Sequence, residues 1–151
     1  MQLVVLGLNH RSAAVEVRER FSFEKNEVES ALNRLYEYEK ISECVILSTC
    51  NRTEIYAVLE DVQSPKAYML DVLKHLKHAD TIDESAFFFY EEKACIEHLF
   101  RVSASLDSLV LGEGQILSQL KGAYIAAYSA GFTGTVFNIL FQRAISVGKK
   151  V

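Results

Sequence analysis

Cysteine is scarce in this chain, and its three copies follow no recognised pattern. Cys44, Cys50 and Cys95 are an odd number, and no two of them form a Cys-x-x-Cys pair. Such a set provides neither a disulfide framework nor the usual spacing of zinc ligands. We therefore expect free thiols, a reducing cytoplasm as the location, and no bound metal.

Long apolar runs are also missing. No segment approaches the roughly 18 consecutive apolar residues that a membrane-spanning helix requires. Residues 1–7 are apolar, but they are few and lack a basic flank, so they predict a first strand rather than a signal peptide. We expect no association with a membrane.

The chain has no excess of positive charge. Its formal net charge is −4, which argues against a domain that grips nucleic acid through a broad basic face. Three pairs of basic residues stand close together: Arg18 with Arg20, Lys74 with Lys77, and Lys149 with Lys150. Such pairs are more typical of solvated helix edges than of phosphate clamps. Any contact with RNA must therefore be local.

The first 92 residues alternate between strand and helix patterns. Apolar runs at 3–8, 45–47, 55–59 and 87–90 predict four strands. Helical spacing predicts a helix after Ser22 and another from Pro65, with Ser64 as its N-cap. The resulting order, β-α-β-β-α-β, is typical of a ferredoxin-like fold with an antiparallel sheet. We expect an α+β protein whose residues 1–92 form this subdomain.

Residues 93–151 show a helical period throughout. Apolar faces predict helices around residues 95–102, 116–127 and 137–145, with a loop near 105–108 and a break at Gly131 and Gly134. We expect a second, helical subdomain over 93–151. The last helical pattern reaches Val151 without a C-terminal cap, which suggests that the chain has been cut from a longer protein.

Cys50 lies where one predicted strand ends and the next begins, in the segment Ser48-Thr49-Cys50-Asn51-Arg52. A cysteine attacks as its thiolate, and its ordinary pKa of about 8.5 leaves little thiolate at neutral pH. Arg52 is positioned in sequence to lower that pKa, while Thr49 and Asn51 can donate hydrogen bonds to an oxyanion or a substrate. The alternative is a small apolar residue buried at a strand end.

Other polar residues extend this candidate site. His98 flanks an apolar helix face and can serve either as an acid/base partner of Cys50 or as interface filler. Glu113, Gln115 and Gln119 predict a polar pocket wall for a small zwitterion, with an exposed polar face as the alternative. Residues 112–114, Gly-Glu-Gly, lack the third glycine and the preceding strand of a dinucleotide fingerprint.

Five blocks of residues make the chain similar to the glutamyl-tRNA reductases, which open the five-carbon route to tetrapyrroles (5-aminolevulinate and porphyrin biosynthesis). The blocks are residues 7–13 with 16–19, 48–56, 98–102, 106–116, and 141–145 with 147–149. One departure is that the family commonly has proline where Gly114 stands. This loosens a helix entry but removes no functional side chain.

The resemblance implies that Cys50 attacks the ester of glutamyl-tRNA(Glu), which gives a glutamyl thioester. NADPH then reduces the thioester to glutamate-1-semialdehyde. It also implies that His98 is important for activity near the thioester. The implied binding residues for the glutamyl group are Thr49, Asn51, Arg52, Ser108, Glu113, Gly114, Gln115 and Gln119.

In that family an NADPH-binding domain and a helical dimerisation domain follow the catalytic domain. The resemblance therefore implies that NADPH belongs to the full-length enzyme, which is a homodimer and can channel its product to glutamate-1-semialdehyde aminotransferase. We expect residues 1–151 alone to form or hydrolyse the thioester without reducing it. Two other hypotheses remain: a Cys/His amidohydrolase, and a non-catalytic ferredoxin-like module that binds an amino acid or a protein.

Overall fold

The computed structural model describes residues 1–105 and 115–150. Within them, four strands form one antiparallel sheet in the order β2-β3-β1-β4. The strands are β1 (Gln2–Asn9), β2 (Ile41–Ser48), β3 (Arg52–Leu59) and β4 (Phe88–Glu91). This order places β3 between β1 and β2, as the split β-α-β arrangement requires. The predicted α+β class with a ferredoxin-like antiparallel sheet is confirmed.

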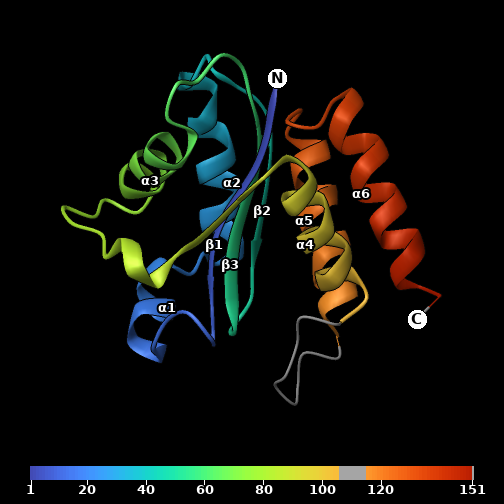
Figure 1. Ribbon diagram of the computed structural model, residues 1–151, viewed down its shortest axis with the longest axis horizontal. Helices are drawn as coiled ribbons and strands as arrows, with labels where there is room; N and C mark the ends of the chain where they lie inside the picture. The colour runs from blue at the N-terminus through green and yellow to red at the C-terminus, as the bar shows by residue number, and fades with distance from the viewer. Residues whose placement is uncertain (106–114, 151) are drawn as a thin grey trace.

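Three helices cover one face of the sheet, on the left in Figure 1. They are α1 (Val15–Phe21), α2 (Lys25–Arg34) and α3 (Pro65–Leu76), with short 3-10 turns η1 (Leu35–Glu37) and η2 (Glu84–Ala86) beside them. The periodicity did not predict α1, because Phe21 is the buried residue among its seven. Ser64 precedes α3 as predicted, although its side chain makes no capping hydrogen bond.

The other three helices cover the opposite face, on the right in Figure 1. They are α4 (Glu92–Ser103), α5 (Ile116–Ser129) and α6 (Thr135–Gly148). With helices on both sides, the middle strand β3 is buried at every position instead of alternating between core and solvent. Because α4 and α5 pack directly on the sheet, both halves of the chain share this sheet. The division into 1–92 and 93–151 stays a prediction.

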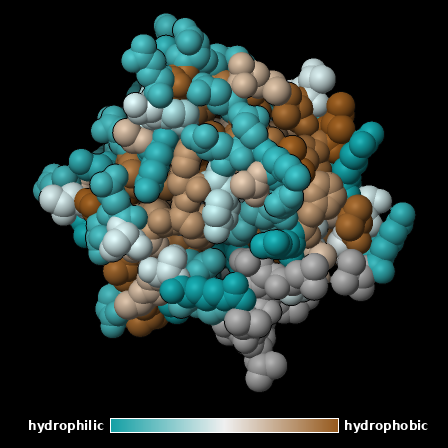
Figure 2. All heavy atoms as spheres, viewed as in Figure 1, coloured by the Kyte–Doolittle hydropathy of each residue, from teal (hydrophilic) through white to brown (hydrophobic). Residues whose placement is uncertain are grey.

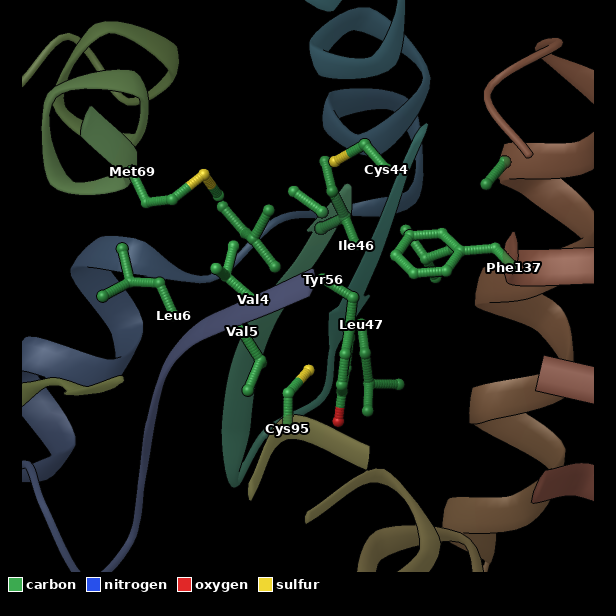
Figure 3. Close-up of a cluster of buried hydrophobic side chains, with 14 of the residues drawn as sticks. Val4, Val5, Leu6, Cys44, Ile46, Leu47, Tyr56, Met69, Cys95 and Phe137 are labelled. Atoms are coloured by element: carbon green, nitrogen blue, oxygen red, sulfur yellow. The ribbon is translucent and has the colours of Figure 1, made fainter. Parts of the chain in front are cut away.

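The core lies on both faces of the sheet, and Figure 3 shows a cluster of its side chains. Successive residues of a strand point to opposite faces, so neighbours in sequence enter different halves of the core. On one side lie Val4, Leu6 and Met69, and on the other Val5, Leu47, Tyr56, Cys95 and Phe137. No helix among the described residues is long and apolar enough to cross a membrane.

Helix α6 packs through one face only. Phe137, Phe141 and Ala144 are fully buried, whereas Ile139 and Val147 are exposed. Figure 2 shows the corresponding hydrophobic surface at the right of the molecule, over α6. The predicted helical period of this segment therefore describes a helix that buries one side against α4, α5 and Tyr56 of the sheet.

A buried carboxylate fastens α6 to the sheet. Glu43 of β2 accepts hydrogen bonds from the backbone N–H groups of Gly134 (2.6 Å), Val136 (3.2 Å) and Phe137 (2.8 Å). These N–H groups belong to the start of α6, where no helical carbonyl is available to them and the helix dipole favours an anion. The edge strand β2 thus supplies the N-terminal cap of a helix that follows it by about 90 residues.

Replacing Glu43 with alanine leaves three helix N–H groups without their acceptor. We expect a loss of about 2 to 4 kcal/mol in the free energy of unfolding, measured by urea denaturation. Glu43→Gln retains one acceptor oxygen and is expected to lose less. Glu39→Ala, at an exposed glutamate, serves as the control and should change stability by less than about 0.5 kcal/mol. Equal effects at Glu43 and Glu39 would contradict the capping role.

Candidate active site

Cys50 lies at the bend of the β2–β3 hairpin, and its side chain is exposed. The backbone N–H of Thr49 donates to the carbonyl oxygen of Arg52 (2.8 Å). The Thr49 hydroxyl oxygen accepts from the N–H groups of Asn51 (3.1 Å) and Arg52 (3.2 Å). Threonine favours turns through such local bonds. The predicted hairpin with a cysteine at its bend is confirmed, and Thr49 is the residue that fixes it.

Arg52 begins β3, and its guanidinium lies inside the protein. The side chain is 1% exposed, and Nη1 is 3.0 Å from Oε2 of Glu54, which is fully buried. Arg52 and Glu54 are two apart on a strand, so both project from the face that α4 covers. The predicted actions of Arg52 on the Cys50 thiol and on a substrate carboxyl group stay predictions.

His98 of α4 contacts the same carboxylate oxygen. Its Nε2 is 2.7 Å from Oε2 of Glu54, and the side chain is 7% exposed. The rings of Phe88 and Tyr90 on β4 flank the imidazole, with centroid distances of 4.9 and 5.2 Å. His98 therefore lies at the interface between α4 and the sheet. Among the described residues, no hydrogen bond joins it to Cys50.

Glu54 and Tyr56 complete this buried network, and neither was among the site residues predicted from the sequence. The Tyr56 hydroxyl donates to Oε1 of Glu54 (2.6 Å). Burial alone would raise the pKa of Glu54, but the hydrogen bond and charge of His98, the charge of Arg52 and the Tyr56 bond together lower it. Burial, and then the Glu54 charge, raise the pKa of Tyr56 well above its ordinary value. In the sequence, the signal that could have identified Glu54 is the alternation of polar residues in an otherwise apolar strand.

Gly7 of β1 makes room for this network. It pairs with Glu54 on β3 and with Phe88 on β4. A Cβ atom at this position would lie 2.6 Å from Cζ of Phe88 and 3.0 Å from Cγ of Glu54, which is too close for either contact to persist. Glycine is therefore required here for Glu54 and Phe88 to approach each other across the backbone of β1.

Gln115 and Gln119 lie at the start of α5. Gln115, which immediately precedes α5, is exposed. Gln119 lines a pocket of about 370 Å³ between α2, β2 and α5, and Ser48 at the end of β2 lines the same pocket. This places Gln119 near the base of the Cys50 hairpin. The predicted residues Ser108, Glu113 and Gly114 lie outside the described residues.

The three thiols occupy different environments. Cys50 is exposed, while Cys44 and Cys95 are buried. Burial raises the pKa of Cys44 to about 12. Burial, followed by the charges of Glu54 and Glu92, raises the pKa of Cys95 further. Within residues 1–105 and 115–150, no three Cys, His, Asp or Glu side chains are arranged to hold a metal ion.

We expect an alkylating reagent to modify Cys50 first in the native protein. Reaction requires access and a thiolate, and both are lacking at Cys44 and Cys95. Mass spectrometry of the partly labelled protein should locate the first adduct at Cys50, and denaturant should expose all three thiols. A Cys50 that labels faster than a free model cysteine supports catalysis, whereas an equal or slower rate supports the non-catalytic binding module.

The low pKa of Glu54 makes its contribution to stability pH-dependent. The folded state keeps this carboxylate ionised below its ordinary pKa of 4.5, whereas the unfolded chain takes up a proton there, so stability is lost as the pH falls. Glu54→Gln removes this dependence and should cost about 3 kcal/mol at neutral pH. Urea denaturation should show the gap between wild type and variant shrinking below about pH 4.5. A gap that stays constant would contradict the ionised state.

The sequence matches known proteins along its whole length. Residues 6–151 match the family described as "Glutamyl-tRNAGlu reductase, N-terminal domain". The chain is 42% identical over 151 residues to the glutamyl-tRNA reductase of Bacillus subtilis (strain 168), covering 99% of this chain and 33% of that protein. It is 43% identical over 152 residues to the glutamyl-tRNA reductase of Listeria welshimeri, covering 100% of this chain and 35% of that protein.

The fold also matches that of a solved structure. The fold matches glutamyl-tRNA reductase from Methanopyrus kandleri with a TM-score of 0.76 and 34% sequence identity, over 98% of this chain and 33% of that one. The chain thus spans about a third of the length of the relatives that it matches. It belongs to the family of glutamyl-tRNA reductase N-terminal domains.

Proposed function

We propose that this chain is the catalytic domain of a glutamyl-tRNA reductase and that Cys50 is its nucleophile. The observation that carries the proposal is the exposed Cys50 thiol at a hairpin bend fixed by Thr49, next in sequence to the buried Arg52–Glu54–His98 network. The proposed substrate follows from membership of the family. The choice of Cys50 as the nucleophile follows from the exposure of its thiol at the hairpin bend.

The first step is an acyl transfer. The Cys50 thiolate attacks the carbonyl carbon of the ester that joins glutamate to the terminal ribose of the RNA. A carbon–sulfur bond forms, the carbon–oxygen bond breaks, and the ribose oxygen leaves with a proton. The Thr49 hydroxyl still has its own proton to donate, and the Asn51 side chain carries an amide, so both can stabilise the oxyanion that develops.

The glutamyl group is proposed to lie between the hairpin and the start of α5. The location of Gln119 beside the end of β2 supports this placement. Thr49, Asn51, Arg52 and Gln115 are proposed as further contacts, as are Ser108, Glu113 and Gly114 outside the described residues. Arg52 and the glutamine amides suit the carboxyl groups of glutamate.

NADPH, bound elsewhere in a full-length reductase, would supply the hydride that reduces the thioester to glutamate-1-semialdehyde. The charged RNA, the homodimeric state, channelling to the aminotransferase and the cytoplasmic location are proposed from the family. Residues 1–151 are proposed to form or hydrolyse the thioester without completing the reduction. What this chain contributes is the acyl acceptor and the groups around it.

One observation favours a second candidate function. A Cys/His amidohydrolase uses an acidic or amide group to orient its histidine, and Glu54, 2.7 Å from His98, is such a group. The two functions differ in substrate, because an amidohydrolase releases ammonia or an amine from a free amide. Ammonia release from glutamine, without any reaction on charged RNA, would favour the amidohydrolase.

We expect Cys50→Ser to slow the deacylation of glutamate-charged RNA by at least about 100-fold, since a hydroxyl is far less ionised than a thiol. Intact-protein mass spectrometry should find a glutamyl adduct on the wild type and none on the variant. Cys44→Ala, at a buried thiol, is the matched control and should keep both the rate and the adduct. Unchanged deacylation by Cys50→Ser would refute Cys50 as the nucleophile. Formation of the semialdehyde by residues 1–151 with NADPH would refute the proposal that this chain cannot complete the reduction.

A further inference from the structure

We propose that Glu54 is a positioning residue that holds a proton on Nε2 of His98. The nitrogen left with a lone pair is then Nδ1, and proton transfer during acylation of Cys50 takes place there. The inference rests on the proposed function for its role in catalysis. The tautomer itself depends only on contacts within the protein.

The geometry of the Glu54–His98 contact decides which nitrogen carries the proton. Oε2 of Glu54 is 2.7 Å from Nε2 of His98. An ionised carboxylate only accepts hydrogen bonds, so the nitrogen that faces it must be protonated. The lowered pKa of Glu54 keeps the carboxylate ionised at neutral pH. A neutral imidazole has one proton, which leaves Nδ1 as the acceptor.

The carboxylate is held at both oxygens and cannot turn away from His98. Nη1 of Arg52 is 3.0 Å from Oε2, and the Tyr56 hydroxyl is 2.6 Å from Oε1. Gly7 pairs with Glu54 on the neighbouring strand β1, and a Cβ atom there would lie only 3.0 Å from Cγ of Glu54. A group fixed at every polar atom holds its partner in one orientation.

The imidazole is confined as well. The rings of Phe88 and Tyr90 flank it, and α4 supports it from behind. Two titratable groups contact His98 among the described residues: Glu54 on β3 and Tyr90 on β4. Arg52 and Tyr56 on β3 and Cys95 on α4 interact with Glu54 in turn.

Fixing the proton on Nε2 matters for the chemistry in two ways. When the imidazole is neutral, Nδ1 is the nitrogen that can accept the proton of the Cys50 thiol. Once Nδ1 has taken that proton, the imidazolium is paired with the Glu54 carboxylate, and the same proton can pass to the ribose oxygen as the carbon–oxygen bond breaks. A buried carboxylate behind a histidine stabilises the cation in this manner.

Nitrogen-15 NMR of histidine-labelled protein tests the tautomer without any RNA. In a pH series, the wild-type His98 signals should show Nε2 protonated throughout, with any change of protonation at Nδ1, and His98→Asn is used to assign them among the four histidines. A neutral His98 that carries its proton on Nδ1 would overturn the proposal. The measurement is made on the wild type, so it holds even if a variant fails to fold.

Glu54→Gln tests the consequence. It removes the negative charge that pairs with His98, so we expect the His98 nitrogen-15 signals to shift and the rate of glutamyl adduct formation to fall about 10- to 100-fold. Glu43→Gln is the matched control, because it also replaces a buried carboxylate in the same sheet. It should lower stability but keep the tautomer and the rate. Equal losses of rate in Glu54→Gln and Glu43→Gln would show that Glu54 has only a structural role and would overturn the proposal.

Failure of the two proposals can be told apart. A wild type that forms no adduct on Cys50 but shows the Nε2–H tautomer would remove the proposed function and leave the positioning by Glu54 without that reaction. A wild type that forms the adduct but shows the Nδ1–H tautomer would keep the function and overturn the role of Glu54.

Discussion

The carboxylate of Glu54 is the group on which this site depends. It is fully buried and joins a cation and a phenol of its own strand to the imidazole of His98, 44 residues further along the chain. A buried charge is costly unless it is paired and hydrogen-bonded. The same requirement therefore holds Arg52, His98 and Tyr56 in place, and it demands glycine at position 7, where any side chain would displace Glu54 or Phe88.

A second buried carboxylate, Glu43, explains how the far layer of helices stays in register with the sheet. It caps α6 from the edge strand β2, while Glu54 anchors α4 from the middle strand β3. The two contacts connect the sheet to two helices of the second half of the chain. Helix α4 can then present His98 at one defined height above β3. The precision of the site is a property of this three-layer packing.

Local patterns were enough to predict the sheet, five of the six α-helices that the described residues form, and the position of Cys50 at a bend. Apolar runs mark strands, and Pro65 marks a helix start, because these signals act within a few residues. The partners of Arg52 were not predictable in this way. Its residue type suggested contact with a thiol or a substrate, whereas the fold buries it against Glu54. Pairing of Glu54 with His98 depends on how α4 crosses the sheet, which no local pattern contains.

The exposed thiol and the buried network suit different parts of the proposed reaction. A charged RNA is a macromolecule, so its ester is reached by a nucleophile at the surface, and the tip of a hairpin provides one. Proton transfer benefits from the opposite environment, because the hydrogen bond between a histidine and a carboxylate is stronger where water is excluded. The β3 strand satisfies both conditions within a few residues, since it leaves the exposed Cys50 bend and immediately enters the core at Arg52 and Glu54.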